Sequence, residues 1–119
     1  MRFIWVGAGG AVGSLLRYGI ALWFGTSRFP WGTLIVNLAG SFALGVLMTY
    51  ALGRWPTTIT AGLAVGLVGG FTTFSTFAWE TLTMTQAGGI SRAALYIVVS
   101  LAGGLVAALL GFATGRALA

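Results

Sequence analysis

The chain has 119 residues, 58% hydrophobic and 6% charged, and a water-soluble domain of this size could not bury so much apolar surface. With neither cysteine nor histidine, and with Glu80 as the only acid, it lacks the side chains for thiol, transition-metal or paired-carboxylate chemistry, so we expect no enzyme. The net charge of +5 comes from six arginines scattered singly between apolar runs, whereas a nucleic-acid surface gathers its basic side chains on one face. The composition therefore predicts one all-α membrane domain over residues 1–119, with room for four transmembrane helices of about 20 residues each.

The first two predicted spans carry small and polar residues at helical spacing. We expect the first span over residues 3–24. Its polar face ends at Arg17, which either snorkels to the membrane surface or points into a polar vestibule. We expect the second span over residues 31–52, and its polar stripe contains Asn37. An amide in hydrocarbon must find partners, so Asn37 either bonds a neighbouring helix or presents its N–H donors to an anion.

The third predicted span, residues 57–85, contains a stretch that is unsuited to a continuous membrane helix. Gly69 and Gly70 are followed by Phe71-Thr-Thr-Phe-Ser-Thr-Phe77, so glycines and β-branched residues interrupt the apolar run. Freed backbone groups are tolerated in a membrane only where protein or a wet cavity covers them, and such breaks mark ion or substrate sites. We therefore expect a broken third helix, the alternative being a tight glycine-mediated helix crossing.

The residues after the expected break suit a small ion. If the helix resumes there, Phe74 and Phe77 share one face, while Thr76 and Glu80 lie on an adjacent face. A ring's edge is the positive part of its quadrupole, and hydroxyls can replace part of a hydration shell, which favours a small anion. Backbone carbonyls of residues 69–72, left without helical partners, could instead hold a small cation such as Na+.

The fourth predicted span, residues 93–115, adds two hydroxyls, from Tyr96 and Ser100, beside a row of glycines. The hydroxyls either face a polar path or belong, like the glycines, to a helix-packing surface.

The arginines do not select one orientation in the membrane. If four spans alternate, Arg2, Arg54 and Arg116 lie on one side and Arg28 and Arg92 on the other, while the sixth arginine, Arg17, lies within the first span. This difference gives almost no bias under the positive-inside rule, so we expect insertion in both orientations. Four helices also enclose too little space for a lined pore. Both arguments predict an antiparallel, dual-topology homodimer.

Three motifs follow one another along the chain: Gly9-Gly-Ala-Val-Gly-Ser-Leu-Leu-Arg-Tyr18, Gly32-Thr-Leu-Ile-Val-Asn-Leu-Ala-Gly-Ser-Phe42 and Gly69-Gly-Phe-Thr-Thr-Phe-Ser-Thr-Phe77. In residues and spacing they strongly resemble the Fluc/CrcB family of bacterial fluoride channels, and the third motif is the specific one. The resemblance implies a dual-topology homodimer with two antiparallel pores in the bacterial plasma membrane. Such a dimer lets fluoride leave the cytoplasm passively and so gives fluoride resistance. The chain departs from some members at Gly104, where they extend a polar track on the fourth helix.

The resemblance also implies roles for individual residues. Phe74 and Phe77 match the phenylalanines of the family's aromatic box, and Asn37 matches its pore amide. Gly69 and Thr72 match the positions whose backbone carbonyls hold a structural Na+ at the dimer interface. The remaining polar positions are Thr76, Tyr96 and Ser100 along the polar track, Arg17 near a vestibule, and Glu80 on the polar side of the third span.

Two other functions compete with the channel. A small multidrug resistance-type, proton-coupled antiporter also has four short spans, dual topology and one membrane carboxylate, which here would be Glu80. Such an antiporter does not need the break and its hydroxyl cluster, and proteins resembling it carry the acid in the first span. A non-transporting assembly subunit would need only the glycine-rich packing surfaces, and it leaves the cluster at residues 72–77 unexplained.

Overall fold

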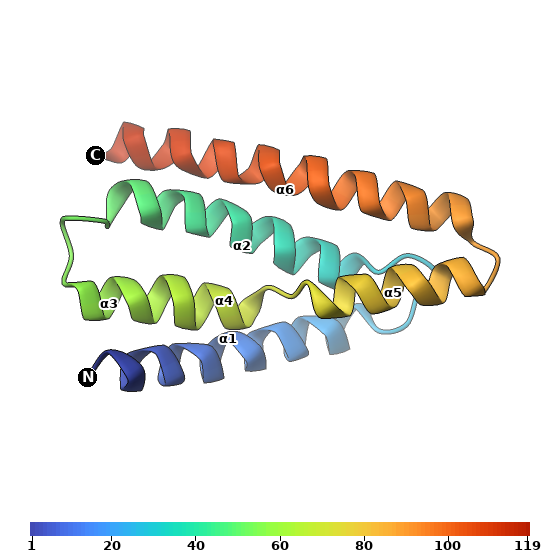
Figure 1. The fold of residues 1–119 in the computed structure, drawn as a ribbon, viewed down its shortest axis with the longest axis horizontal. Helices are drawn as coiled ribbons and strands as arrows, with labels where there is room; N and C mark the ends of the chain where they lie inside the picture. The colour runs from blue at the N-terminus through green and yellow to red at the C-terminus, as the bar shows by residue number, and fades with distance from the viewer.

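Four helical segments long and apolar enough to cross a membrane make up the chain in the computed structural model, which describes residues 1–119 (Figure 1). The structure contains no strand, so it confirms the predicted all-α class with four spans. The predicted bounds differ most for the fourth helix, which runs from Ile90 to Leu118 rather than over residues 93–115. The second helix ends at Tyr50 rather than at residue 52.

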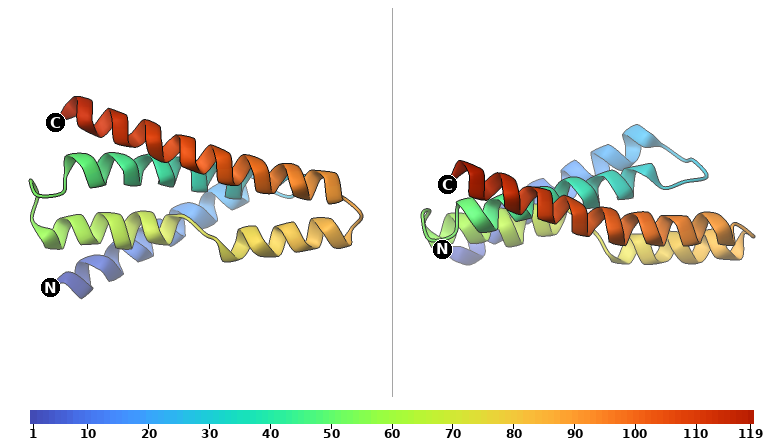
Figure 2. Two further views of the ribbon diagram at one scale, coloured as in Figure 1. Left: turned by 45° about the horizontal axis from the view of Figure 1, so that its top comes forward. Right: turned by 90° about the horizontal axis from the view of Figure 1, so that it is seen from above.

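Successive spans run antiparallel, and the third span is divided into several elements. The elements are α1 (Arg2–Phe24), α2 (Trp31–Tyr50), α3 (Thr57–Ala61), the π-helix η1 (Gly62–Val68), α4 (Gly69–Phe71), α5 (Ser75–Gln86) and α6 (Ile90–Leu118). Both termini and the α2–α3 connection lie at one end of the molecule, and the other two connections lie at the opposite end (Figure 1). α2 packs along α6, while α1 packs against η1 and α4 and crosses the third span obliquely (Figure 2).

Glycines allow these helix pairs to approach closely. A Cβ added at Gly13 of α1 would overlap the backbone of Leu67, and one at Gly66 would overlap the backbone of Val6. A Cβ at Gly111 of α6 would likewise overlap the backbone of α2. In lipid, helices associate through such close van der Waals contact rather than through a hydrophobic driving force, so these glycines position the third span between its neighbours.

The third span contains a π-helical segment, η1, directly before α4. Over Gly62–Val68 the backbone follows the i→i+5 pattern of a π-helix, and the N–H of Gly69 still reaches the carbonyl of Ala64. π-Helical turns are rare and often lie at functional sites. The sequence patterns did not predict this element.

Most large apolar side chains face outward. Only 15 of the 119 residues are buried within the single chain, which suits a protein whose surroundings are lipid or a second membrane-embedded chain. The buried cluster consists of Leu34, Phe77 and Tyr96, where α2, α5 and α6 meet. This cluster adjoins the site described next.

Candidate functional site

Between α4 and α5 the backbone leaves the helical conformation. α4 ends at Phe71, Thr72 is extended with φ −87° and ψ 161°, and α5 begins at Ser75. Thr72 makes the last hydrogen bonds of the preceding helix. Its backbone N–H and its hydroxyl both donate to the carbonyl of Val68 at 3.0 Å. We refer to the non-helical residues 72–74 as the interruption.

Asn37 of α2 pairs with both backbone groups of Thr73 inside the interruption. Its Nδ2 donates to the Thr73 carbonyl at 3.0 Å, and its Oδ1 accepts the Thr73 N–H at 2.8 Å. The Thr73 hydroxyl accepts the N–H of Thr76, in the first turn of α5, at 3.2 Å. Asn37 therefore makes the hydrogen bonds to a neighbouring span that its sequence context predicted as one alternative. One Nδ2 hydrogen remains as a further donor, and its use toward an ion stays a prediction.

Arg17 of α1 contacts α4, the helical segment just before the interruption. Its Nε donates to the carbonyl of Gly70 at 3.2 Å, and the side chain is partly buried. A cation near the last carbonyls of a helix is favourable, because these carbonyls lack helical donors and carry the negative end of the dipole. Arg17 is thus directed toward the interruption and not outward to the membrane surface. Its place in a vestibule stays a prediction.

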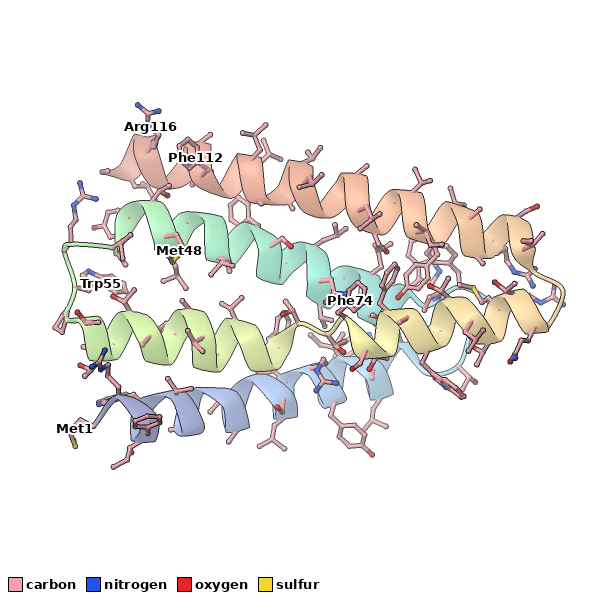
Figure 3. All side chains as sticks on the ribbon, in the orientation of Figure 1. Met1, Met48, Trp55, Phe74, Phe112 and Arg116 are labelled. Atoms are coloured by element: carbon pink, nitrogen blue, oxygen red, sulfur yellow. The ribbon has the colours of Figure 1, made fainter.

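Two phenylalanines, Phe74 in the interruption and Phe77 in α5, lie next to one another in different surroundings. The ring centroids of Phe74 and Phe77 are 5.7 Å apart, and the planes are tilted by 57°. Phe77 is 8% exposed, whereas Phe74 is 75% exposed at the interruption (Figure 3). The Phe77 ring meets that of Tyr96 edge to face at 5.0 Å. One ring of the pair is therefore fixed within the chain, and the other is open to its surroundings.

Polar groups from α5 and α6 lie beyond the phenylalanines. The hydroxyl of Tyr96, a residue with no exposed surface, donates to Glu80 Oε1 at 3.0 Å. One turn further along α6, the Ser100 hydroxyl is buried and has no hydrogen-bond partner. Thr76 is half-buried on α5. The structure thus joins Glu80 to Tyr96, while no hydrogen bond joins the Thr76 or Ser100 hydroxyl to that pair.

Two hollows flank these residues. One of about 240 Å³ opens beside the interruption and is lined by Asn37, Ser41, Thr72, Thr73, Phe74 and neighbouring apolar residues. The other, of about 260 Å³, lies under the α1–α2 connection and includes Arg28 and Glu80. The first hollow brings an amide, hydroxyls and freed backbone to membrane depth, where lipid cannot satisfy them.

Sequence reasoning missed the partners that hold the interruption, namely the Thr73 backbone for Asn37 and the Gly70 carbonyl for Arg17. The sequence did contain a signal for these contacts. The backbone groups freed by a helix break in lipid need polar partners, and the first two spans carry the polar side chains Arg17 and Asn37.

An α-helical membrane protein whose spanning helix is interrupted beside polar side chains has the architecture of proteins that pass ions or small solutes across a bilayer. The chain belongs to the CrcB family, because the family model described as "CrcB-like protein, Camphor Resistance (CrcB)" matches residues 4–112.

Individual relatives match over nearly their whole length. The chain is 46% identical to the fluoride-specific ion channel FluC of a Thermus thermophilus strain, covering 98% of this chain and 95% of the relative. It is 44% identical to the fluoride-specific ion channel FluC 2 of Moorella thermoacetica, covering 94% of each. These matches confirm the resemblance found in the three motifs. Together with the four apolar helices, they identify a multi-pass bacterial membrane protein.

Proposed function

We propose that the chain is a fluoride-specific ion channel that gives passive fluoride efflux from the cytoplasm and so fluoride resistance. The observation that carries this proposal is the near full-length similarity, at 40% to 47% identity, to relatives named fluoride-specific ion channels. The antiporter alternative is not favoured, since none of these relatives bears such a name.

The arrangement of donors supports an anion path through the site. Phe74 and Phe77, whose rings lie 5.7 Å apart, form the aromatic box of the proposed pore, and the positive edge of such a ring attracts an anion. Ser100 brings a buried hydroxyl whose hydrogen is free to bind the ion. A small anion enters a narrow passage only if such donors replace its water, so these groups favour fluoride over larger anions. The other proposed roles are Asn37 as a donor beside the box, Thr76 and Tyr96 along the polar track, Arg17 at the vestibule, and Glu80 as polar support.

A second, inverted copy of the chain is the proposed cover for the hollow beside the interruption. That hollow presents Asn37, Ser41 and Thr72 at membrane depth, and Phe74 at its edge is 75% exposed. Exposure of such polar groups to hydrocarbon costs several kcal/mol for each unsatisfied one, so a protein surface is the favourable cover. The end with both termini carries three of the single arginines and the opposite end two, which supports insertion in both orientations (Figure 1). The proposed assembly is therefore an antiparallel, dual-topology homodimer in which the interruption forms the pore-lining break.

The carbonyls of Gly69 and Thr72 suit the proposed structural Na+ at the dimer interface. In a continuous helix they would accept the N–H groups of Thr73 and Thr76, but those donate to Asn37 Oδ1 and to the Thr73 hydroxyl. Neither carbonyl therefore receives its usual helical donor. Unwound backbone carbonyls are typical Na+ ligands in membrane proteins, so this geometry supports a Na+ that joins two copies of the interruption.

Flux from liposomes tests the proposed function. Purified protein in liposomes loaded with fluoride or chloride should release fluoride, but not chloride, with no proton gradient imposed. Phe77→Ile should strongly reduce this release while the dimer remains intact. Proton-dependent transport of a cationic dye that is lost in Glu80→Gln would establish the antiporter instead. Absence of any flux from an intact dimer would favour an assembly subunit.

A further inference from the structure

One aromatic ring outside the spanning helices contacts the proposed pore residues. Phe29, in the connection between α1 and α2, meets the ring of Tyr96 edge to face, with centroids 5.5 Å apart and planes at 74°. Tyr96 in turn meets Phe77 at 5.0 Å, and Phe77 lies 5.7 Å from Phe74. A continuous row of four rings therefore leads from the connection to the interruption.

Tyr96 lies between Phe29 and Phe77 in this row and also bonds Glu80. Its ring lies against Phe77 and Phe29, and its hydroxyl donates to Glu80 Oε1 at 3.0 Å. The side chain has no exposed surface, so Phe29 contributes to its burial. Since a tyrosine ring and hydroxyl move as one rigid body, a shift of the ring displaces both the Phe77 contact and the bond to Glu80.

The connection itself holds Phe29 in a defined position. Pro30, with φ −81° and ψ 70°, has the angles of an inverse γ-turn, and the N–H of Trp31 donates across it to the Phe29 carbonyl at 2.9 Å. The hydroxyl of Ser27 donates to the same carbonyl. The rings of Phe29 and Trp31 are 4.7 Å apart, so both the backbone and the side chain of Phe29 have fixed contacts.

We propose that Phe29 is a positioning residue that fixes the Tyr96 ring and, through it, the orientation of Phe77 and of the Glu80 carboxylate along the ion path. This inference rests on the proposed channel function. It predicts that the α1–α2 connection influences both the rate and the anion selectivity, although it lies outside the spanning helices. A residue that only anchors the connection would change the stability of the fold and leave selectivity unchanged.

The test compares fluoride and chloride release from liposomes for the wild type, Phe29→Ala, Phe29→Tyr and Phe24→Ala. Phe24 is the matched control, because it lines the same hollow under the connection and is absent from the row of rings. Phe29→Ala should lower the fluoride rate roughly two- to tenfold, the range that one edge-to-face aromatic pair supplies. It should also lower the ratio of fluoride to chloride release. Phe29→Tyr should restore both values, and Phe24→Ala should match the wild type.

Thermal unfolding of the same samples separates positioning from simple anchoring. If Phe29→Ala unfolds at a lower temperature but keeps the wild-type rate and ratio per folded dimer, the inference is wrong. If Phe29→Ala fails to fold, the same release measurements are made on Ser27→Ala. It removes one bond that fixes the Phe29 carbonyl and should shift the rate and ratio in the same direction by a smaller factor. A wild type that releases no fluoride overturns the proposed function and this inference together. An active wild type with unaffected Phe29 variants overturns the inference alone.

Discussion

The pairing of Asn37 with the Thr73 backbone yields a prediction whose size follows from the structure. Asn37→Ala removes two hydrogen bonds, of 2.8 Å and 3.0 Å, and leaves the N–H and the carbonyl of Thr73 without partners. Each of these two groups left unsatisfied costs about 1–3 kcal/mol, so together they should destabilise the ordered interruption by about 2–6 kcal/mol. Because 1.4 kcal/mol is a factor of about ten in an equilibrium, the ratio of ordered to disordered interruption would then fall more than tenfold. We expect fluoride release to fall at least tenfold.

Two measurements check this prediction on the same protein. The first is fluoride release from liposomes, followed with a fluoride electrode. The second is hydrogen exchange of the peptide covering residues 69–76, which should lose protection in Asn37→Ala. Thr114→Ala is the control, because its exposed hydroxyl bonds only to the carbonyl of Leu110 in its own helix. Wild-type release together with wild-type protection in Asn37→Ala would refute the proposed role of the pairing.

The remaining predictions concern the rings, the polar track, the interface and the helix packing. Phe74→Ile and Phe77→Ile should each strongly reduce fluoride release in liposomes while size-exclusion chromatography still shows a dimer; unchanged release would exclude the aromatic box. Ser100→Ala should slow release roughly tenfold, because it removes a hydroxyl that would bind the ion, and equal rates would make Ser100 a packing residue. Replacing Na+ by choline should lower the thermal stability of the dimer, whereas a stability independent of Na+ would argue against the structural ion. Gly13→Ala should lower the yield and thermal stability of folded protein, since its Cβ would overlap the backbone of the third span, while Gly7→Ala, with open space around it, should be neutral.

The sequence predicts the helices of this chain well because lipid imposes simple rules. Apolar runs of sufficient length must be helical in a bilayer, and the four spans follow from that requirement alone. The three motifs were enough to predict the family, which the comparisons confirm.

Contacts between spans were much harder to predict. Three hydrogen bonds between spans depend on the relative height and rotation of separate helices. They join Asn37 to Thr73, Arg17 to Gly70, and Tyr96 to Glu80. Helix–helix register is set by many weak contacts spread along the glycine-rich surfaces, and no spacing within one helix records it. Phe29 escaped notice for a related reason, because its role depends on a turn at Pro30 that returns the ring toward α6.

The pair of hydrogen bonds between the Asn37 amide and the Thr73 backbone also bears on the order of assembly. The Asn37 amide bonds the Thr73 N–H and carbonyl, which in a regular helix or strand would bond other backbone groups. Asn37 and Thr73 belong to the same chain. A single chain can therefore order its interruption before it forms the proposed dimer. In the proposed homodimer, association of two copies would then join surfaces that are already ordered, so little conformational entropy would be lost on pairing.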